Sequence, residues 1–148
     1  MRNTKAAKLR KALSLIALMN YLILLVATSL WPKPVDGQGL LAIITSDLLR
    51  FASTISWLNW IQYNQLEAIA NVLLYLPLGV FLVLFWPRAR VWALSLIPVL
   101  FSLLAEGTQR MFLPDRYATL NDVFYNALGG VLGIVISMSI RRMRKNSK

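Results

Sequence analysis

The sequence of 148 residues contains no cysteine and no histidine. Without cysteine there can be no disulfide bond, thiolate nucleophile or cysteine-based metal site, and without histidine the commonest general base and metal ligand is missing. Serine–histidine–aspartate hydrolases, HExxH zinc enzymes and papain-like proteases are therefore excluded. Any catalysis would use carboxylate, arginine, lysine or tyrosine side chains. The sequence predicts neither a cofactor nor a metal ion.

Acidic residues are also scarce, because six Asp and Glu stand beside sixteen Lys and Arg, whereas 57% of all residues are hydrophobic. This composition excludes intrinsic disorder and is atypical of a soluble domain. The net charge of +10 does not indicate nucleic-acid binding, because most cations flank long apolar runs, where they would meet anionic lipid headgroups. We therefore expect one integral membrane domain spanning residues 1–148.

Three apolar stretches are long enough to cross a hydrocarbon core of roughly 30 Å as helices, and another, which begins at Val91, reaches that length only by continuing past Glu106. The predicted fold class is all-α, a polytopic membrane protein with a four-helix transmembrane bundle. The predicted spans cover about residues 12–31, 66–87, 91–112 and 121–140. A cleaved signal peptide is the alternative for the first stretch, although its apolar run is longer than in a usual signal sequence.

Two polar pairs are candidates for capping boxes at the starts of helices. Asn64 with Glu67 precedes the second span, and Thr119 with Asp122 precedes the fourth. In each pair the two residues are three positions apart, the spacing at which both side chains bond backbone N–H groups of the first turn.

The cations are distributed unevenly between the two sides that these spans define. Twelve lie near the termini and at Arg88 and Arg90, whereas four lie in or beside the other loops. By the positive-inside rule, both termini and the short turn at Arg88 are expected in the cytoplasm. Residues 32–64 and 113–120 are then expected outside.

The segment before the second span has an amphipathic helical pattern. Asp47, Arg50 and Thr54 occupy a different face from the apolar residues. The apolar residues are Leu41, Ile44, Leu48, Phe51, Ile55 and Leu58. This pattern predicts a helix lying in the outer interface or a short re-entrant element, and it leaves open whether residues 40–64 act as a lid.

Glu106 is the most unusual residue of the spans, because a carboxylate ~9 Å below the end of its helix costs several kcal/mol unless it is paired or protonated. Asn71 and Asn126 lie at a similar depth in the second and fourth spans. Gln109 and Arg110 follow Glu106 within one turn and share or border its face. We predict one outward-facing pocket formed by Asn71, Glu106, Gln109 and Asn126.

Further charged residues lie at the expected opening of this pocket, with Asp122 one turn before Asn126 and Arg116 in the outer loop. Arg110 and Arg116 with two carboxylates suit a headgroup that carries phosphate or sugar. Structural alternatives exist for each role. Glu106 would pair with one of the arginines, Asp122 would cap its helix, and the asparagines would hydrogen-bond helices together.

Proline and glycine residues within the spans predict bends and close packing. Pro77 frees the Leu73 carbonyl and bends the second span, and Gly79 follows just past the bend. Gly129 and Gly133 form a GxxxG motif, which allows the fourth helix to approach a neighbour closely. We interpret Pro77 and the three glycines as structural.

These residues resemble the VanZ-like family of small membrane proteins, which is named for a teicoplanin resistance determinant. Asn71, Pro77 and Gly79 match its N-x5-P-x-G segment. Glu106, Gln109, Arg116, Asp122, Asn126, Gly129 and Gly133 match its E-x2-Q, R, D-x3-N-x2-G-x3-G signature. Thr119 departs from the pattern, because many members carry an acidic residue there, and this departure weakens any role for paired acids in that loop.

The resemblance implies a multi-pass protein of the bacterial cytoplasmic membrane that is linked to lowered susceptibility to teicoplanin-type antibiotics. Fold transfers more safely than function within such a family. The function that the sequence favours is binding of an amphiphilic envelope molecule at the outer leaflet. Expected partners are a membrane lipid, a lipid-linked glycan or a lipoglycopeptide, and no nucleic acid.

Whether the protein is an enzyme stays open at this point. As an enzyme it would use Glu106 or Asp122 as acid or base, with Arg110 or Arg116 on a phosphate. The alternative is a non-catalytic accessory protein that recognises a headgroup or the transmembrane helix of a partner. A transporter is disfavoured, because no charged residue lies in the inner part of any span. The oligomeric state is not indicated.

Overall fold

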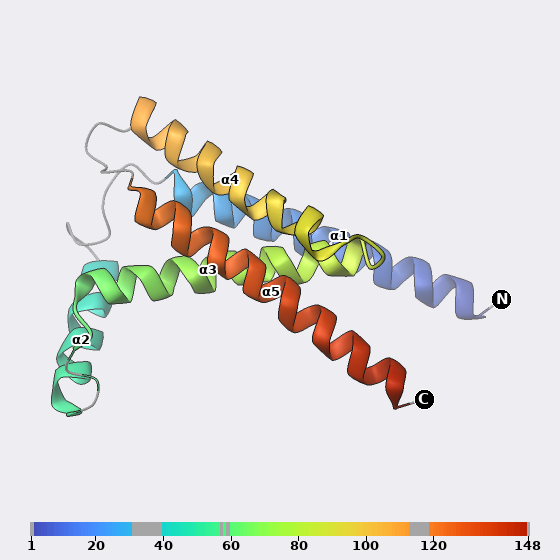
Figure 1. The fold of residues 1–148 in the computed structure, drawn as a ribbon, viewed down its shortest axis with the longest axis horizontal. Coiled ribbons are helices and arrows are strands. Elements are labelled where there is room, and N and C mark those ends of the chain that lie inside the picture. The colour runs from blue at the N-terminus through green and yellow to red at the C-terminus, as the bar shows by residue number, and fades with distance from the viewer. Residues whose placement is uncertain (1, 31–39, 57, 59, 113–118, 148) are drawn as a thin grey trace.

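The computed structural model describes residues 2–30, 40–56, 58, 60–112 and 119–147. These residues form five helices and no strand (Figure 1). The helices are α1 (Arg2–Ser29), α2 (Leu40–Thr54), α3 (Tyr63–Phe85), α4 (Val91–Phe112) and α5 (Leu120–Asn146). Of these, α1, α3, α4 and α5 are long and apolar enough to cross a membrane. The predicted all-α fold with four spans is therefore confirmed.

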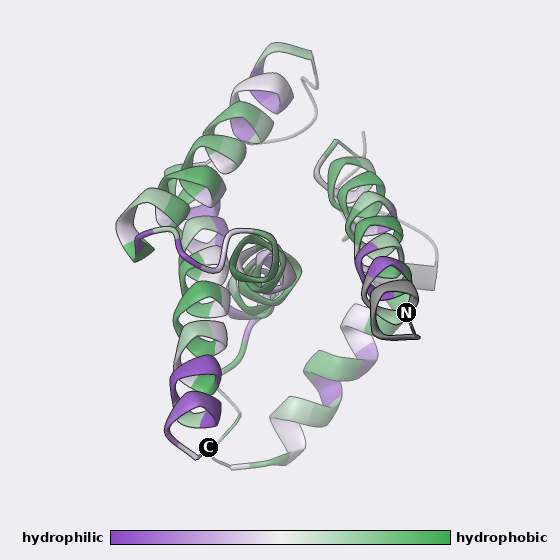
Figure 2. Ribbon diagram, turned by 90° about the vertical axis from the view of Figure 1, so that its right-hand side faces the viewer, coloured by the Kyte–Doolittle hydropathy of each residue, from purple (hydrophilic) through white to green (hydrophobic). Residues whose placement is uncertain are grey.

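The two ends of the bundle differ in what they contain. Both chain termini and the short turn between α3 and α4 lie at one end, which we call the terminal end (Figure 1). The starts of α3 and α5 and the end of α4 lie at the other end, which we call the loop end. Helix α2 lies there as well, at a steep angle to α3 in Figure 1. Figure 2 shows hydrophobic residues along most of the helices and hydrophilic turns at the C-terminal end of α5.

The predicted capping box is confirmed for α5 and wrong for α3. Thr119 Oγ1 accepts a 3.2 Å hydrogen bond from the Asp122 N–H, and Asp122 Oδ2 accepts one of 3.3 Å from the Thr119 N–H. In α3 the helix begins earlier, at Tyr63, so Asn64 lies inside its first turn. There the Gln65 side chain accepts a 3.1 Å hydrogen bond from the Gln62 N–H, because a glutamine also reaches back across three residues.

The helix expected before the second span is present as α2, which ends at Thr54, before the last predicted apolar positions. Ile44, Leu48 and Phe51 are exposed on its surface, whereas Ala52 is buried. Because no other described helix covers these three large apolar side chains, they are suited to contact with lipid.

Glycine residues allow α3 and α5 to touch backbone to backbone. A Cβ atom added to Gly129 would overlap the Val72 carbonyl, and one added to Gly133 would overlap the Leu76 carbonyl. Gly79 lies against the backbone of α5 in the same way. Any larger side chain at these positions would force the two helices apart, as the GxxxG interpretation requires.

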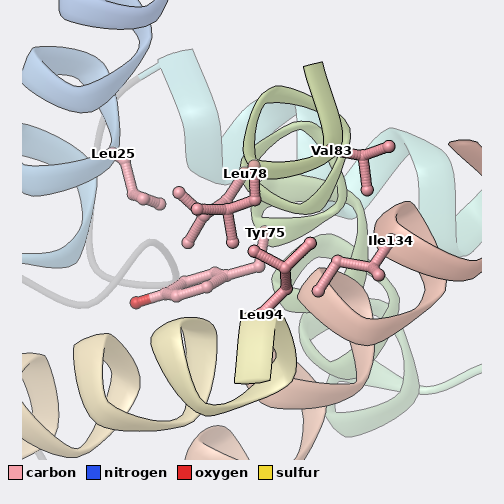
Figure 3. Packing of buried hydrophobic residues seen from close by; sticks show 7 residues of the cluster. Leu25, Tyr75, Leu78, Val83, Leu94 and Ile134 are labelled. Atoms are coloured by element: carbon pink, nitrogen blue, oxygen red, sulfur yellow. The ribbon is translucent and has the colours of Figure 1, made fainter. Parts of the chain in front are cut away.

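Apolar side chains pack together in the interior of the bundle (Figure 3). Leu25, Tyr75, Leu78, Leu82, Val83, Leu94 and Ile134 form one buried cluster that draws on all four spans. Pro98 packs on α5, because a Cβ atom on Gly130 would overlap its ring. Arg141 on α5 donates a 3.1 Å hydrogen bond to the Val83 carbonyl near the end of α3, where a cation is favoured.

Helix α1 is the least buried of the four spans, because 11% of the residues in its most apolar stretch are buried against 28% for each of the others. Its Tyr21 hydroxyl donates a 2.7 Å hydrogen bond to the Leu74 carbonyl of α3, close to the Pro77 position. This bond and a second one near Ser29 fix a helix that otherwise contacts the bundle sparsely.

Candidate functional site

Polar side chains are buried together in the half of the bundle nearer the loop end. The buried polar residues of the described chain are Ser29, Ser102, Glu106, Gln109 and Asn126, and the phenol of Tyr75 is buried as well. We call these six residues the polar cluster. Four different helices supply them: Ser29 from α1, Tyr75 from α3, Asn126 from α5 and the remaining three from α4.

Helix α4 presents three members of the cluster because of their spacing. Ser102, Glu106 and Gln109 recur at intervals of four and three residues, which places them on one helical face above Leu94 and Pro98. Glu106 is only 8% exposed, so its carboxylate lies inside the bundle and not in lipid. The same face of α4 is thus apolar near the terminal end and polar near the loop end.

Two hydrogen bonds tie the cluster to neighbouring helices. The Gln109 amide donates a 2.6 Å bond to the backbone carbonyl of Ser29 on α1. The Asn126 Nδ2 atom on α5 donates a 3.2 Å bond to the Ser102 hydroxyl on α4. These bonds hold α1, α4 and α5 around one polar interior.

Two buried polar atoms of the cluster retain hydrogen-bonding capacity. Asn126 Oδ1 and the Tyr75 hydroxyl make no hydrogen bond of regular geometry with any described residue. The Tyr75 hydroxyl lies beside the Ser29 and Ser102 side chains and within electrostatic range of Glu106. Figure 3 shows it pointing away from Val83, Leu94 and Ile134. Buried polar groups are rarely left in this condition, so both atoms indicate a place for a further partner.

Asn71 and Asp122 form a separate pair outside the polar cluster. Asn71 Nδ2 donates a 3.0 Å hydrogen bond to Asp122 Oδ1, which joins α3 to the first turn of α5. The other carboxylate oxygen, Asp122 Oδ2, accepts from the Thr119 hydroxyl at 2.7 Å. We expected Asn71 to face Glu106, but its amide bonds to Asp122 instead, and the structural alternative accounts for both residues.

The two arginines of the expected site differ in what the structure describes. Arg110 is exposed on α4 and makes no ion pair within the described part of the chain. Arg116 lies outside the described residues. No group of three acidic residues that could hold a metal ion occurs in the described ranges.

The chain matches the VanZ/LLP1 family over residues 17–141, which is most of its length and includes the whole polar cluster. It belongs to this family. No curated protein and no solved structure matches the chain. The VanZ/LLP1 match extends the resemblance seen between Asn71 and Gly133 to the first span, so Ser29 falls within the family region.

Sequence reasoning missed three members of the cluster in this VanZ/LLP1 chain. Tyr75 lies four residues after Asn71, and Ser102 lies four residues before Glu106, so the helical period could have indicated both. Ser29 contributes its backbone carbonyl to Gln109, and no sequence pattern indicates that contact. Tyrosine and serine are also common in apolar helices, which is why neither stood out.

Proposed function

We propose that this VanZ/LLP1 protein binds the polar headgroup of an amphiphilic cell-envelope molecule in the polar cluster. The observation that carries the proposal is the pair of buried atoms, Tyr75 Oη and Asn126 Oδ1, that have no regular hydrogen bond among the described residues. A ligand that donates to Asn126 Oδ1 would remove the energetic penalty of leaving this acceptor unpaired, about 1–3 kcal/mol. The same ligand would add a bond to the Tyr75 hydroxyl, which lies beside the Ser29 and Ser102 side chains.

The charge distribution supports access from the outer leaflet. Arg88, Arg90 and the basic ends of α1 and α5 all belong to the terminal end, and the positive-inside rule favours that end in the cytoplasm. The polar cluster then lies in the outer half of a bacterial cytoplasmic membrane, at a depth that the headgroup of a lipid can approach.

The hydrogen-bonding capacity of the cluster favours a hydroxyl or amide group on the ligand. Asn126 Oδ1 can only accept, so the ligand must donate to it, whereas the Tyr75 hydroxyl can donate or accept. A sugar or peptide headgroup supplies such donors. A lipid-linked glycan or a lipoglycopeptide has this chemistry, which agrees with the link of VanZ-like proteins to teicoplanin. Arg110 and Arg116 are proposed contacts for a phosphate at the edge of the site.

The geometry supports binding over catalysis by paired carboxylates. Both oxygens of Asp122 accept hydrogen bonds from Asn71 and Thr119. Glu106 is therefore the one carboxylate that the described residues supply to the cluster. An acid and base pair would need a second group with a matched pKa.

The test is native mass spectrometry of the protein extracted gently from its own membrane. We expect a co-purifying amphiphile, and we expect Glu106→Gln to lower its occupancy at least five-fold while the melting temperature stays near that of the wild type. Glu67→Gln, at an exposed position of α3, is the matched control and should change neither quantity. The proposal fails if no amphiphile co-purifies, or if occupancy falls only as far as melting temperature does.

A cellular assay tests the link to antibiotics separately. Cells that produce Glu106→Gln should become more susceptible to teicoplanin than cells with equal membrane levels of the wild type. Arg116→Lys keeps the charge and removes the bidentate geometry, so a phosphate contact there predicts a loss as well. Unchanged susceptibility in both variants would contradict the antibiotic link.

A further inference from the structure

An apolar groove lies between α1 and α4 in the half of the bundle nearer the loop end. Its volume is about 160 Å³, and its walls are Val26, Ser29 and Leu30 of α1 with Phe101, Leu104, Ala105 and Thr108 of α4. The four α4 residues follow one another at intervals of three, one and three, so they line a single helical face. This face adjoins the one that carries Ser102, Glu106 and Gln109.

The groove and the polar cluster share a wall. Ser29 lines the groove, and its backbone carbonyl accepts the hydrogen bond from Gln109. Phe101 also lines the groove, and its ring packs edge-on against Tyr75 with centroids 6.1 Å apart. Ala105 directly precedes Glu106. A molecule in the groove would therefore have apolar walls along its length and the polar cluster beside it, which is the polarity of an amphiphile.

The groove opens towards the surface that meets the hydrocarbon of the membrane. Val26 is 42% exposed and Leu104 is 70% exposed, so the two lips of the groove face outward from the bundle. Along α4, the distance from Phe101 to Thr108 is roughly 10 Å. An apolar cavity of roughly 150 Å³ holds one benzene molecule, so this volume suits a segment of one hydrocarbon chain and not two chains.

We propose that this groove is a hydrocarbon subsite that binds one chain of an amphiphile, which enters sideways from the membrane between α1 and α4. The inference rests on the proposed function, because the headgroup of the same molecule occupies the polar cluster. It adds the class of ligand, which is a lipid that can place one hydrocarbon chain in the groove without a second. It also adds the route by which the ligand reaches the site.

The experiment uses the full chain in lipid nanodiscs and a hexadecanoic acid that carries a diazirine in its chain. After irradiation, mass spectrometry locates the adducts. We expect adducts on the seven residues that line the groove at several times the frequency found at Leu96 and Leu100, which are exposed on α4 outside the groove. Adducts spread evenly over these positions would overturn the proposal.

Two substitutions test the groove itself. Ala105→Phe should fill it from α4 and Val26→Trp from α1, and each should lower groove adducts at least five-fold. Gly107→Phe is the matched control, because a Cβ atom there would meet nothing within 4 Å and Gly107 does not line the groove. Circular dichroism and thermal melting show whether each variant is folded. If both filling variants are folded and label like the wild type, the groove is not the subsite.

Competition between lipids shows which type of hydrocarbon chain occupies the groove. A variant of the polar cluster, Tyr75→Phe, separates this proposal from the proposed function. An excess of unlabelled polyprenyl phosphate or of diacyl phosphatidylglycerol should suppress groove labelling, and the better competitor identifies the chain as isoprenoid or acyl. Suppression by neither would contradict the subsite. The groove adducts of the fatty acid and the native mass spectrum of Tyr75→Phe are separate readouts. Adducts confined to the groove, together with an unchanged amount of co-purifying amphiphile in Tyr75→Phe, would mean that headgroup binding by the polar cluster fails while the groove stands.

Discussion

The side-chain amide of Gln109 donates a 2.6 Å hydrogen bond to the backbone carbonyl of Ser29, the last residue of α1. Carbonyl groups in the last turn of a helix have no partner within that helix, and Gln109 supplies one. Although α1 is the least buried span, this contact joins its last residue to Gln109 of the polar cluster, at one wall of the groove.

The first prediction concerns this contact. Gln109→Leu should lower the free energy of unfolding by ~1 kcal/mol, the usual size of a hydrogen bond between membrane helices. Thr108→Val is the control, because the Thr108 hydroxyl bonds to Leu104 within α4 and joins no second helix. Thermal melting in detergent measures the stability of both variants. Equal losses of stability would show that the bond from Gln109 to α1 contributes no more than a hydrogen bond within α4.

The second prediction concerns the contact between α3 and α5. Gly133→Ala should destabilise the protein by about 1–3 kcal/mol, because the added methyl group overlaps the Leu76 carbonyl and the helices must separate. Gly107→Ala places the same methyl group in open space and should be neutral or stabilising by up to ~1 kcal/mol, since alanine favours the helix. Melting temperatures that move together would refute the close approach.

A third prediction separates Asp122 from Glu106. Asp122→Ala removes the capping box and the bond to Asn71, so it should cost about 1–2 kcal/mol of stability. Retention of the co-purifying amphiphile should fall only as far as stability does. If Asp122→Ala kept the wild-type melting temperature and lost the ligand, Asp122 would be part of the site and the structural assignment would be wrong.

The fourth prediction concerns orientation. The chain has no natural cysteine, so single cysteines report their own accessibility. A cysteine at Gln38 should react with a membrane-impermeant maleimide in intact cells, and a cysteine at Ala89 should react only after the cells are opened. The opposite pattern would place the polar cluster in the inner half of the membrane and would contradict access from the outer leaflet.

The sequence was sufficient to predict the spans, because apolar runs of this length with few charges have few alternatives in a folded protein. The burial of Glu106, Gln109 and Asn126 also follows from sequence, since polar groups inside spans must face protein. The capping box of α5 was readable because Thr119 and Asp122 have the required types and spacing. At the start of α3, Gln62 and Gln65 form the capping box instead of Asn64 and Glu67. A pair of glutamines is a weaker sequence signal for a helix start than an asparagine followed by a glutamate.

Other parts of the site depend on distances across the bundle, which sequence does not encode locally. Asn71 and Glu106 have similar depths in their helices, yet the rotation of α3 against α5 brings Asn71 to Asp122. The glycine contacts between α3 and α5 determine this rotation. If α5 were shifted along α3 by one helical turn, each of its side chains would contact different residues. The hydrogen bond from Gln109 to the Ser29 carbonyl likewise cannot be predicted from sequence, because every residue has a backbone carbonyl and no side chain marks this one.

The most direct test of headgroup binding compares the half-buried Tyr21 with the buried Tyr75 by native mass spectrometry and thermal melting. The Tyr21 hydroxyl bonds to the Leu74 carbonyl, whereas the Tyr75 hydroxyl has no regular hydrogen bond among the described residues. Tyr21→Phe should lower stability by ~1 kcal/mol and retain the co-purifying amphiphile. Tyr75→Phe should keep the wild-type melting temperature and lose most of the bound amphiphile. Wild-type occupancy in Tyr75→Phe would contradict headgroup binding by the polar cluster.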